Sequence, residues 1–263
     1  MCHWQWFDTN LPYLVQQTST HCQYSRRYLA WGQSTLAKMS VYIDIHTHRA
    51  YAQKTGVLAL QNITLSNQEM NLDKWLTAGW HPWYIQYTSL QKIKESINHA
   101  AAVKNVVAIG ECGIDRSIDT PVDTQAEVFK YHVEVAAEKQ KPLIIHCVKA
   151  YSDINGLLKK TNFKLPVIFH AYNGNKIQTQ QLLSLNAYFS IGNPISYSAK
   201  KLSNILSEVP LSRLFIETDD STYSIENNYQ EIADILKISL YDLKNQIEIN
   251  FIKIFGNELV STY

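Results

Sequence analysis

The chain has 263 residues and a nearly balanced charge, with 24 Lys and Arg against 23 Asp and Glu. The basic residues are scattered, so the sequence lacks the electrostatic footprint of a broad nucleic-acid binder. No apolar stretch has the length of a membrane span and no signal-peptide pattern is present, which predicts a cytoplasmic protein without a membrane partner. Four irregularly spaced cysteines give neither a disulfide framework nor a zinc-ribbon pattern.

The first forty residues differ in character from the rest. Residues 1–38 mix Cys, His, Trp, Tyr, Gln, Ser and Thr without the period of a helix or a strand. Met39 and Ser40 stand directly before the first apolar run. We therefore expect residues 1–40 to be an N-terminal extension, disordered or upstream of a natural start at Met39, and dispensable for folding. Residues 41–263 have a length typical of one domain.

Eight short apolar runs follow in this domain, and continuous runs rich in Val, Ile and Phe are typical of strands buried on both faces. These candidate strands are Val41–Ile45, Val57–Leu60, Trp75–Trp80, Val106–Gly110, Leu143–Ile145, Val167–Phe169, Tyr188–Ile191 and Leu214–Glu217. Intervening segments carry a helical period, and the clearest are Leu90–Ala101, Thr124–Gln140 and Leu202–Val209. Ser89 and Ser198 are candidate N-caps. The alternation predicts a parallel sheet.

Metal-ligand side chains stand where several of these runs end. They are His46, His48, Glu111, His146, His170 and Asp219. His46 and His48 share one face of a strand because side chains alternate, and imidazole suits Zn, Mn, Fe or Ni. Ligands on strands one, four, five, six and eight converge only if the sheet closes into a ring. The sequence thus favours an α/β fold, a TIM-like (β/α)8 barrel, over an open doubly wound sheet, which places its site at one switch point.

The connection between the first two strands is short. Only residues 49–56 separate them, whereas a parallel crossover normally needs a dozen residues or more. We expect the barrel to be shortened or distorted around strands one and two. The second strand is expected to be rudimentary or antiparallel, with the barrel rim partly open there.

Six motifs occur in an order that resembles the TatD-like metal-dependent hydrolases, a branch of the amidohydrolase superfamily. The motifs are Asp44-Ile45-His46-Thr47-His48, Gly79-Trp80-His81-Pro82-Trp83, Gly110-Glu111-Cys112-Gly113-Ile114-Asp115, Pro142-Leu143-Ile144-Ile145-His146, Phe169-His170-Ala171-Tyr172 with Gly174, and Glu217-Thr218-Asp219. The resemblance covers residues 41–263.

This resemblance implies a hydrolase with two divalent ions, Zn, Mg or Mn. A monomer is the favoured oligomeric state. His46, His48 and Asp219 are implied to hold one ion, His146 and His170 the other, and Glu111 to bridge them. Such ions activate water and stabilise the attacking and leaving oxygens of a phosphodiester, with Asp219 as general base. The implied activity is that of a deoxyribonuclease, a TatD-like 3′–5′ exonuclease on single-stranded DNA or RNA. The alternatives are an ester or amide hydrolase, such as an aminoacyl-tRNA deacylase, and an inactive barrel used for binding.

Several further residues are candidates for substrate contact. The family has Arg-Glu after the strand-five histidine, but this chain has Val148-Lys149. Lys149 and Arg116 are the candidate replacements for the phosphate contact, with Arg116 preferred. His81 either contacts substrate or fixes the turn at Pro82.

Two groups of side chains near the candidate ligands are expected to be structural. Trp80, Trp83 and Tyr84 are expected to pack at the rim, with base stacking as the alternative. Cys112 and Cys147 each follow a candidate ligand and are expected to be reduced core residues that face away from the site.

Overall fold

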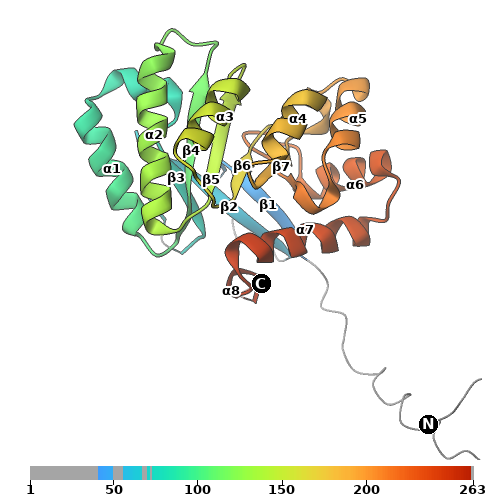
Figure 1. Cartoon of the computed structure of the whole chain (residues 1–263). Helices are drawn as coiled ribbons and strands as arrows, with labels where there is room; N and C mark the ends of the chain where they lie inside the picture. The colour runs from blue at the N-terminus through green and yellow to red at the C-terminus, as the bar shows by residue number, and fades with distance from the viewer. Residues whose placement is uncertain (1–40, 50–55, 67–69, 72, 262–263) are drawn as a thin grey trace, which may run out of the picture. The chain divides into compact units, whose positions relative to one another are not determined.

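A computed structural model describes residues 41–49, 56–66, 70–71 and 73–261 of the chain. Within them, eight parallel strands form one sheet whose spatial order is the chain order (Figure 1). The strands are β1 (Tyr42–Thr47), β2 (Val57–Thr64), β3 (Leu76–Gly79), β4 (Val106–Asp115), β5 (Leu143–Val148), β6 (Val167–Phe169), β7 (Ala187–Ile191) and β8 (Leu214–Ile216). The interpretation of residues 1–40 lies outside the described residues.

The sheet returns to its first strand and forms a nearly closed barrel. Thr47 of β1 pairs with Asp219 in a parallel bridge. The backbone N–H of Asp219 donates to the His46 carbonyl at 3.0 Å, and the N–H of His48 donates to the Asp219 carbonyl at 3.2 Å. The expected (β/α)8 barrel is therefore confirmed, and the junction of β8 with β1 brings two candidate-ligand segments together.

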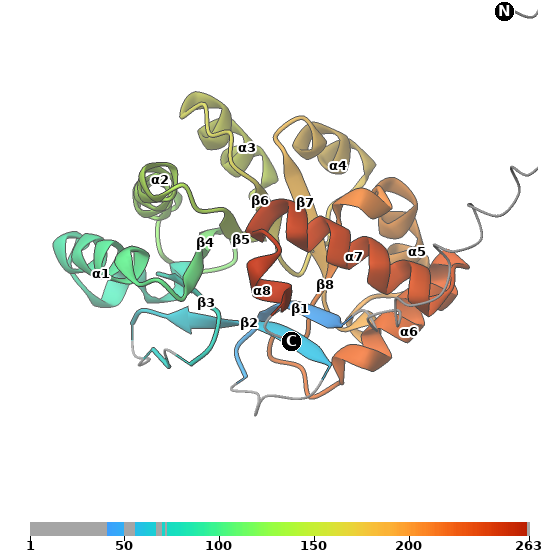
Figure 2. The same cartoon turned by 90° about the horizontal axis from the view of Figure 1, so that it is seen from below.

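From β3 onward, helices lie outside the strands and connect them (Figure 2). The α-helices are α1 (Leu90–Ala102), α2 (Val122–Lys139), α3 (Tyr151–Lys160), α4 (Lys176–Leu183), α5 (Ala199–Glu208), α6 (Ile225–Leu236), α7 (Leu240–Phe255) and α8 (Glu258–Ser261). Short 3-10 turns are η1 (Pro82–Tyr87), η2 (Pro194–Ser196) and η3 (Leu211–Arg213). Ser89 and Ser198 cap α1 and α5 by accepting hydrogen bonds from backbone N–H groups, as expected. None of the described helices is long and apolar enough to cross a membrane.

The expectation that the second strand is rudimentary or antiparallel was wrong. β2 has 8 residues and pairs in parallel with both β1 and β3. Residues 48–56 can span roughly 30 Å when extended, whereas the 6-residue β1 rises only about 20 Å. The chain can therefore return to the start of β2 without a crossover helix. The shortening itself is present, because the described residues contain no helix between β1 and β3.

Strand β4 runs beyond the point where the apolar run ends. It continues through Glu111 to Asp115, although its register with β5 shifts between Ile109 and Cys112. Gly110 has φ +136°, and a side chain at this position would collide with the Ile144 carbonyl of β5. Glycine thus permits the close approach of β4 to β5 next to Glu111. The sequence predicted that the strand ends before the polar residue Glu111. In the structure β4 continues, because the Glu111 side chain has buried partners and the backbone keeps its pairing with β5.

Buried residues join the strands to the outer layer. Cys112 and Cys147 are buried free thiols, as expected, and burial raises the pKa of each. His132 of α2 is fully buried, accepts a hydrogen bond from the Trp80 backbone at 3.0 Å and contacts the Val128 carbonyl at 2.8 Å. An imidazole in these two contacts is neutral, with its proton on Nδ1. His132 therefore holds α2 against the chain directly after β3.

We expect this histidine to make stability fall in acid. Burial lowers the pKa of His132 from 6.5 to about 4. Between these two pH values His132 binds a proton in the unfolded chain but not in the native chain. Its contribution to the free energy of unfolding is therefore fully present above pH 6.5 and is lost as the pH falls toward 4. Between pH 7 and pH 5 this residue alone should lower the free energy of unfolding by about 2 kcal/mol.

Urea unfolding at both pH values measures this loss in the wild type and in His132→Gln. The variant should be less stable at pH 7 but should lose about 2 kcal/mol less on acidification. His99→Gln, at an exposed position of α1, is the matched control and should behave as the wild type. An unchanged pH dependence in His132→Gln contradicts the assignment.

Candidate metal centre

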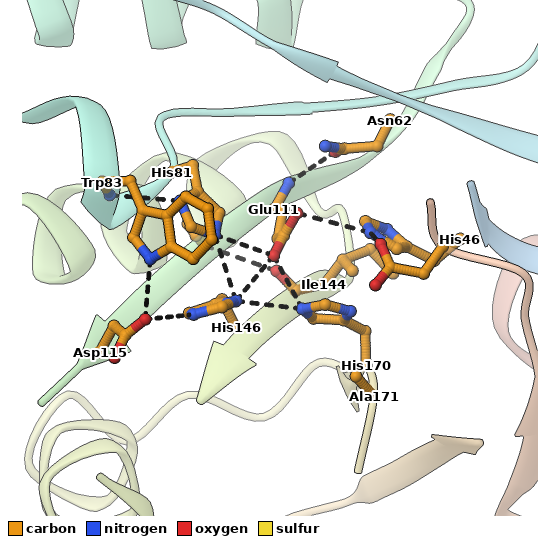
Figure 3. A network of polar contacts seen from close by, with 12 residues as sticks. His46, Asn62, His81, Trp83, Glu111, Asp115, Ile144, His146, His170 and Ala171 are labelled. Carbon is orange, nitrogen blue, oxygen red and sulfur yellow. Dashed lines mark hydrogen bonds and ion pairs between the residues drawn. The ribbon is translucent and has the colours of Figure 1, made fainter. Parts of the chain in front are cut away.

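Glu111 lies at the centre of a cluster of five histidine rings, four of which are labelled in Figure 3. Its Oε1 atom lies 2.7 Å from His170 Nε2, 2.8 Å from His146 Nδ1 and 3.2 Å from His81 Nε2. Its Oε2 atom lies 3.2 Å from His48 Nε2 and 3.4 Å from His46 Nε2. The two oxygens of one carboxylate thus face two different sets of imidazoles. Oε2 faces the pair at the end of β1, and Oε1 faces those from β5 and from the residues that follow β3 and β6.

Asp219 completes the side of the cluster that Oε2 faces. Its Oδ1 atom lies 3.4 Å from His48 Nε2 and 3.6 Å from His46 Nε2. The backbone at Asp219 is left-handed, with φ 53°. Buried Asp44 fixes the preceding residue, because its two oxygens accept hydrogen bonds from the backbone and hydroxyl of Thr218 at 3.0 and 2.6 Å. The closure of the barrel and this clamp together place Asp219 beside the two histidines of β1.

The donor atoms suit divalent cations. Three groups place one donor atom from each member within 4.8 Å of the others: His46 with Glu111 and His170, His46 with His48 and Asp219, and His81 with Glu111 and His146. Both ring nitrogens of the buried His46 lack a hydrogen bond. His146 Nδ1 also lies only 3.2 Å from His170 Nε2. Converging nitrogen lone pairs and unsatisfied buried donors are compensated when a cation binds among them.

The pKa shifts of Glu111 and His46 also indicate that the cluster attracts positive charge. Burial raises the pKa of the Glu111 carboxyl, but His170, His146 and His46 outweigh burial and hold that pKa well below its usual range. Burial lowers the pKa of His46, but Asp219 and Glu111 outweigh burial and raise that pKa to about 9. Carboxylates that draw protons onto a buried imidazole exert the same attraction on a metal cation.

Three buried residues that support the cluster were not assigned a role from the sequence. Asp115 Oδ2 lies 3.2 Å from His146 Nε2, which leaves Nδ1 of that ring facing Glu111. Glu217 Oε1 lies 3.6 Å from His170 Nδ1 and accepts the Ala171 backbone N–H at 2.6 Å. Asn62 accepts the Glu111 backbone N–H at 2.8 Å. Asp115 and Glu217 lie within the quoted motifs, but a sequence does not show which ring each one touches.

A cavity of about 410 Å³ opens over the cluster. Its walls are made by His48, Thr64, His81, Trp83, Tyr84, Glu111, His146, His170, Asp219 and Asp220, so no Lys or Arg is among the described residues that line it. The structure does not bring the two expected phosphate contacts into these walls. Arg116 instead forms a two-bond ion pair with Asp153 at 2.8 Å, and Lys149 follows β5 outside the lining.

Of the two roles that the sequence left open for His81, the structure shows the one that fixes the turn. Its Nδ1 accepts the backbone N–H of Trp83 at 3.2 Å and so fixes the turn at η1. Its Nε2 faces Glu111 in the cavity. Of the aromatic residues beside it, Trp80 is buried as expected, whereas Trp83 lines the cavity and is 50% exposed.

A parallel (β/α)8 barrel with histidines and carboxylates gathered at its strand ends defines a class of metal-site barrels. The family model for TatD related DNase matches residues 49–256. The chain belongs to this family.

Similar proteins agree with this membership. The chain is 35% identical over 147 residues to the "uncharacterized metal-dependent hydrolase YabD" of Bacillus subtilis. The aligned segment covers 54% of this chain and 56% of that protein. It is 33% identical over 183 residues to the "3′-5′ ssDNA/RNA exonuclease TatD" of Citrobacter rodentium, and this aligned segment covers 65% of this chain and 69% of that protein. In fold it resembles YJJV, a TatD homologue from Escherichia coli, with a TM-score of 0.72 at 19% identity over 83% of this chain and 99% of that one.

The contact between Asp115 and His146 generates a prediction about metal affinity. Asp115→Ala removes the carboxylate that orients the ring, and loss of such an outer partner typically weakens metal binding about 10- to 100-fold. Zn²⁺ or Mn²⁺ competition against a chromophoric chelator measures the dissociation constant. Asp153→Ala is the matched control, because it removes a nearby carboxylate that pairs with Arg116. Equal metal affinity in Asp115→Ala and wild type contradicts the orienting role.

Proposed function

We propose that this chain is a divalent-metal-dependent phosphodiesterase, acting as a 3′–5′ exonuclease on single-stranded DNA or RNA. The observation that carries the proposal is the division of the Glu111 carboxylate between two sets of histidines. A carboxylate that offers one oxygen to each side suits a bridge between two cations. The printed name of the Citrobacter relative and the description of the family support nucleic acid as the substrate.

The ligands divide by the oxygen of Glu111 that they face. His46, His48 and Asp219 would hold one ion on the Oε2 side. His146 and His170 would hold the second ion on the Oε1 side, where His81 Nε2 also lies. Imidazole is a better ligand for Zn²⁺ or Mn²⁺ than for Mg²⁺, which prefers an all-oxygen shell. We therefore expect Zn²⁺ or Mn²⁺ to bind more tightly than Mg²⁺.

When bound, the two ions lower the pKa of water and offset charge on the attacking and leaving oxygens of the phosphodiester. The side chain of Asp219 is 35% exposed and lines the cavity, so it can reach a water molecule there and take its proton as general base. Glu111 is 3% exposed and both of its oxygens lie within 3.4 Å of imidazole nitrogens, which suits this carboxylate to a ligand role rather than to that of a base. Asp115 and Glu217 keep His146 and His170 oriented toward the reacting centre.

Two substitutions separate metal retention from proton transfer. Glu111→Ala removes the proposed bridge and should lower bound metal together with turnover. Asp219→Asn keeps a ligand atom of similar size but removes the base, so kcat should fall about a hundredfold or more while at least one ion is retained. Metal analysis and kcat on bis-p-nitrophenyl phosphate and on a single-stranded oligonucleotide give both quantities.

His99→Ala is the control for this pair, since it removes an exposed histidine outside the cluster. Its metal content and its turnover should match the wild type. Turnover near the wild-type value in Asp219→Asn would contradict the assignment of the base. Metal content at the wild-type level in Glu111→Ala would contradict the bridge.

A further inference from the structure

Trp83 stands at the edge of the cavity with half of its surface exposed. It belongs to η1, directly after the turn that places His81 in the cluster. Apolar side chains of this size bury much of their surface in a folded protein and give large contact areas to ligands. The exposed indole therefore offers apolar surface to whatever occupies the cavity.

The ring of Trp83 is fixed by contacts on one side (Figure 3). Its Nε1 donates a hydrogen bond to Asp115 Oδ2 at 2.8 Å. It meets the His81 ring edge to face, with centroids 5.0 Å apart and an interplanar angle of 85°. Because the indole is already held in place, a ligand that contacts it loses little side-chain entropy on binding.

The acidic side chains that line the cavity favour a nucleic acid that also binds through uncharged groups. The carboxylates of Glu111, Asp219 and Asp220 line it, and no Lys or Arg of the described chain does. Acidic walls repel the phosphates of a strand except where cations are bound. The bases of the strand can add affinity beyond the cleaved phosphate without this repulsion, and stacking of a base on an aromatic ring is favourable for every base type.

We propose that Trp83 is the base-binding platform of this site, on which an unpaired nucleobase of the substrate strand stacks beside the cleaved phosphodiester. The inference rests on the proposed function and adds a determinant of specificity to it. A base can reach the indole face only when it is unstacked and unpaired, so the platform selects single strands over duplexes. It also predicts tolerance of base identity, because each base presents a π-face.

The platform shares an anchor with the cluster. The same Asp115 oxygen that accepts from Trp83 Nε1 lies 3.2 Å from His146 Nε2. The base and the phosphate are therefore positioned through one carboxylate. Trp83→Phe keeps an aromatic face but loses the N–H, whereas Trp83→Ala loses both. The pair separates stacking from any effect on Asp115.

Two oligonucleotides of equal length test the platform: oligothymidylate, and the same backbone with abasic tetrahydrofuran residues. KM and kcat are measured with Mn²⁺ for both, and the binding of fluorescein-labelled versions is measured by anisotropy. Trp83→Ala should raise KM and weaken binding for oligothymidylate roughly tenfold to a hundredfold, with little change for the abasic strand. Trp83→Phe should retain most of the preference for bases.

Tyr87→Ala is the matched control, because Tyr87 is 75% exposed in the same η1 turn and does not line the cavity. It should behave as the wild type. Equal weakening for both strands in Trp83→Ala, or an equal loss in Tyr87→Ala, would overturn the platform. The failure of the proposed function looks different: neither strand is hydrolysed. Anisotropy then still decides whether Trp83 binds bases.

Discussion

The carboxylate of Glu111 is 3% exposed, and a buried charge is costly unless partners surround it. Its partners are five imidazoles that come from β1, from β5 and from the residues that follow β1, β3 and β6. Only a closed ring of parallel strands brings those segments to one point. The glycine before Glu111 lets β4 approach β5 closely enough for the carboxylate to reach them. The closed barrel and the candidate site thus both depend on the surrounding of the buried Glu111 carboxylate by imidazoles.

The barrel closes at the junction between β8 and β1, where few backbone hydrogen bonds join the strands. Among the described residues, one parallel bridge joins Thr47 of β1 to Asp219, which follows β8. His46, His48 and Asp219, which lie at this bridge, are the candidate ligands of one ion. Asp44 strengthens the junction through Thr218 from inside the barrel. An ion bound there would link the first strand to the last, so metal binding should stabilise the closed barrel as well as support catalysis.

Local pattern was enough to predict the strands, the closure of the barrel and the gathering of six side chains at one end. It failed for β2, because loop length alone does not say whether an extended connection can span a short strand. It also failed to place Arg116, whose partner Asp153 lies in α3, beyond the neighbouring strand β5. The pairing of Asp115 with His146 was equally invisible, since it depends on the register between β4 and β5 and on side-chain positions that only the folded chain fixes.

The most direct test of the central claim is anomalous diffraction from crystals of the protein grown with Zn²⁺. We expect two zinc peaks, one on each side of Glu111. The first should lie about 2.0–2.2 Å from atoms of His46, His48 and Asp219, and the second at similar distances from His146 and His170. A single peak that leaves Glu111 uncoordinated, or peaks only outside the cluster, would contradict the bridging carboxylate on which the proposed function depends.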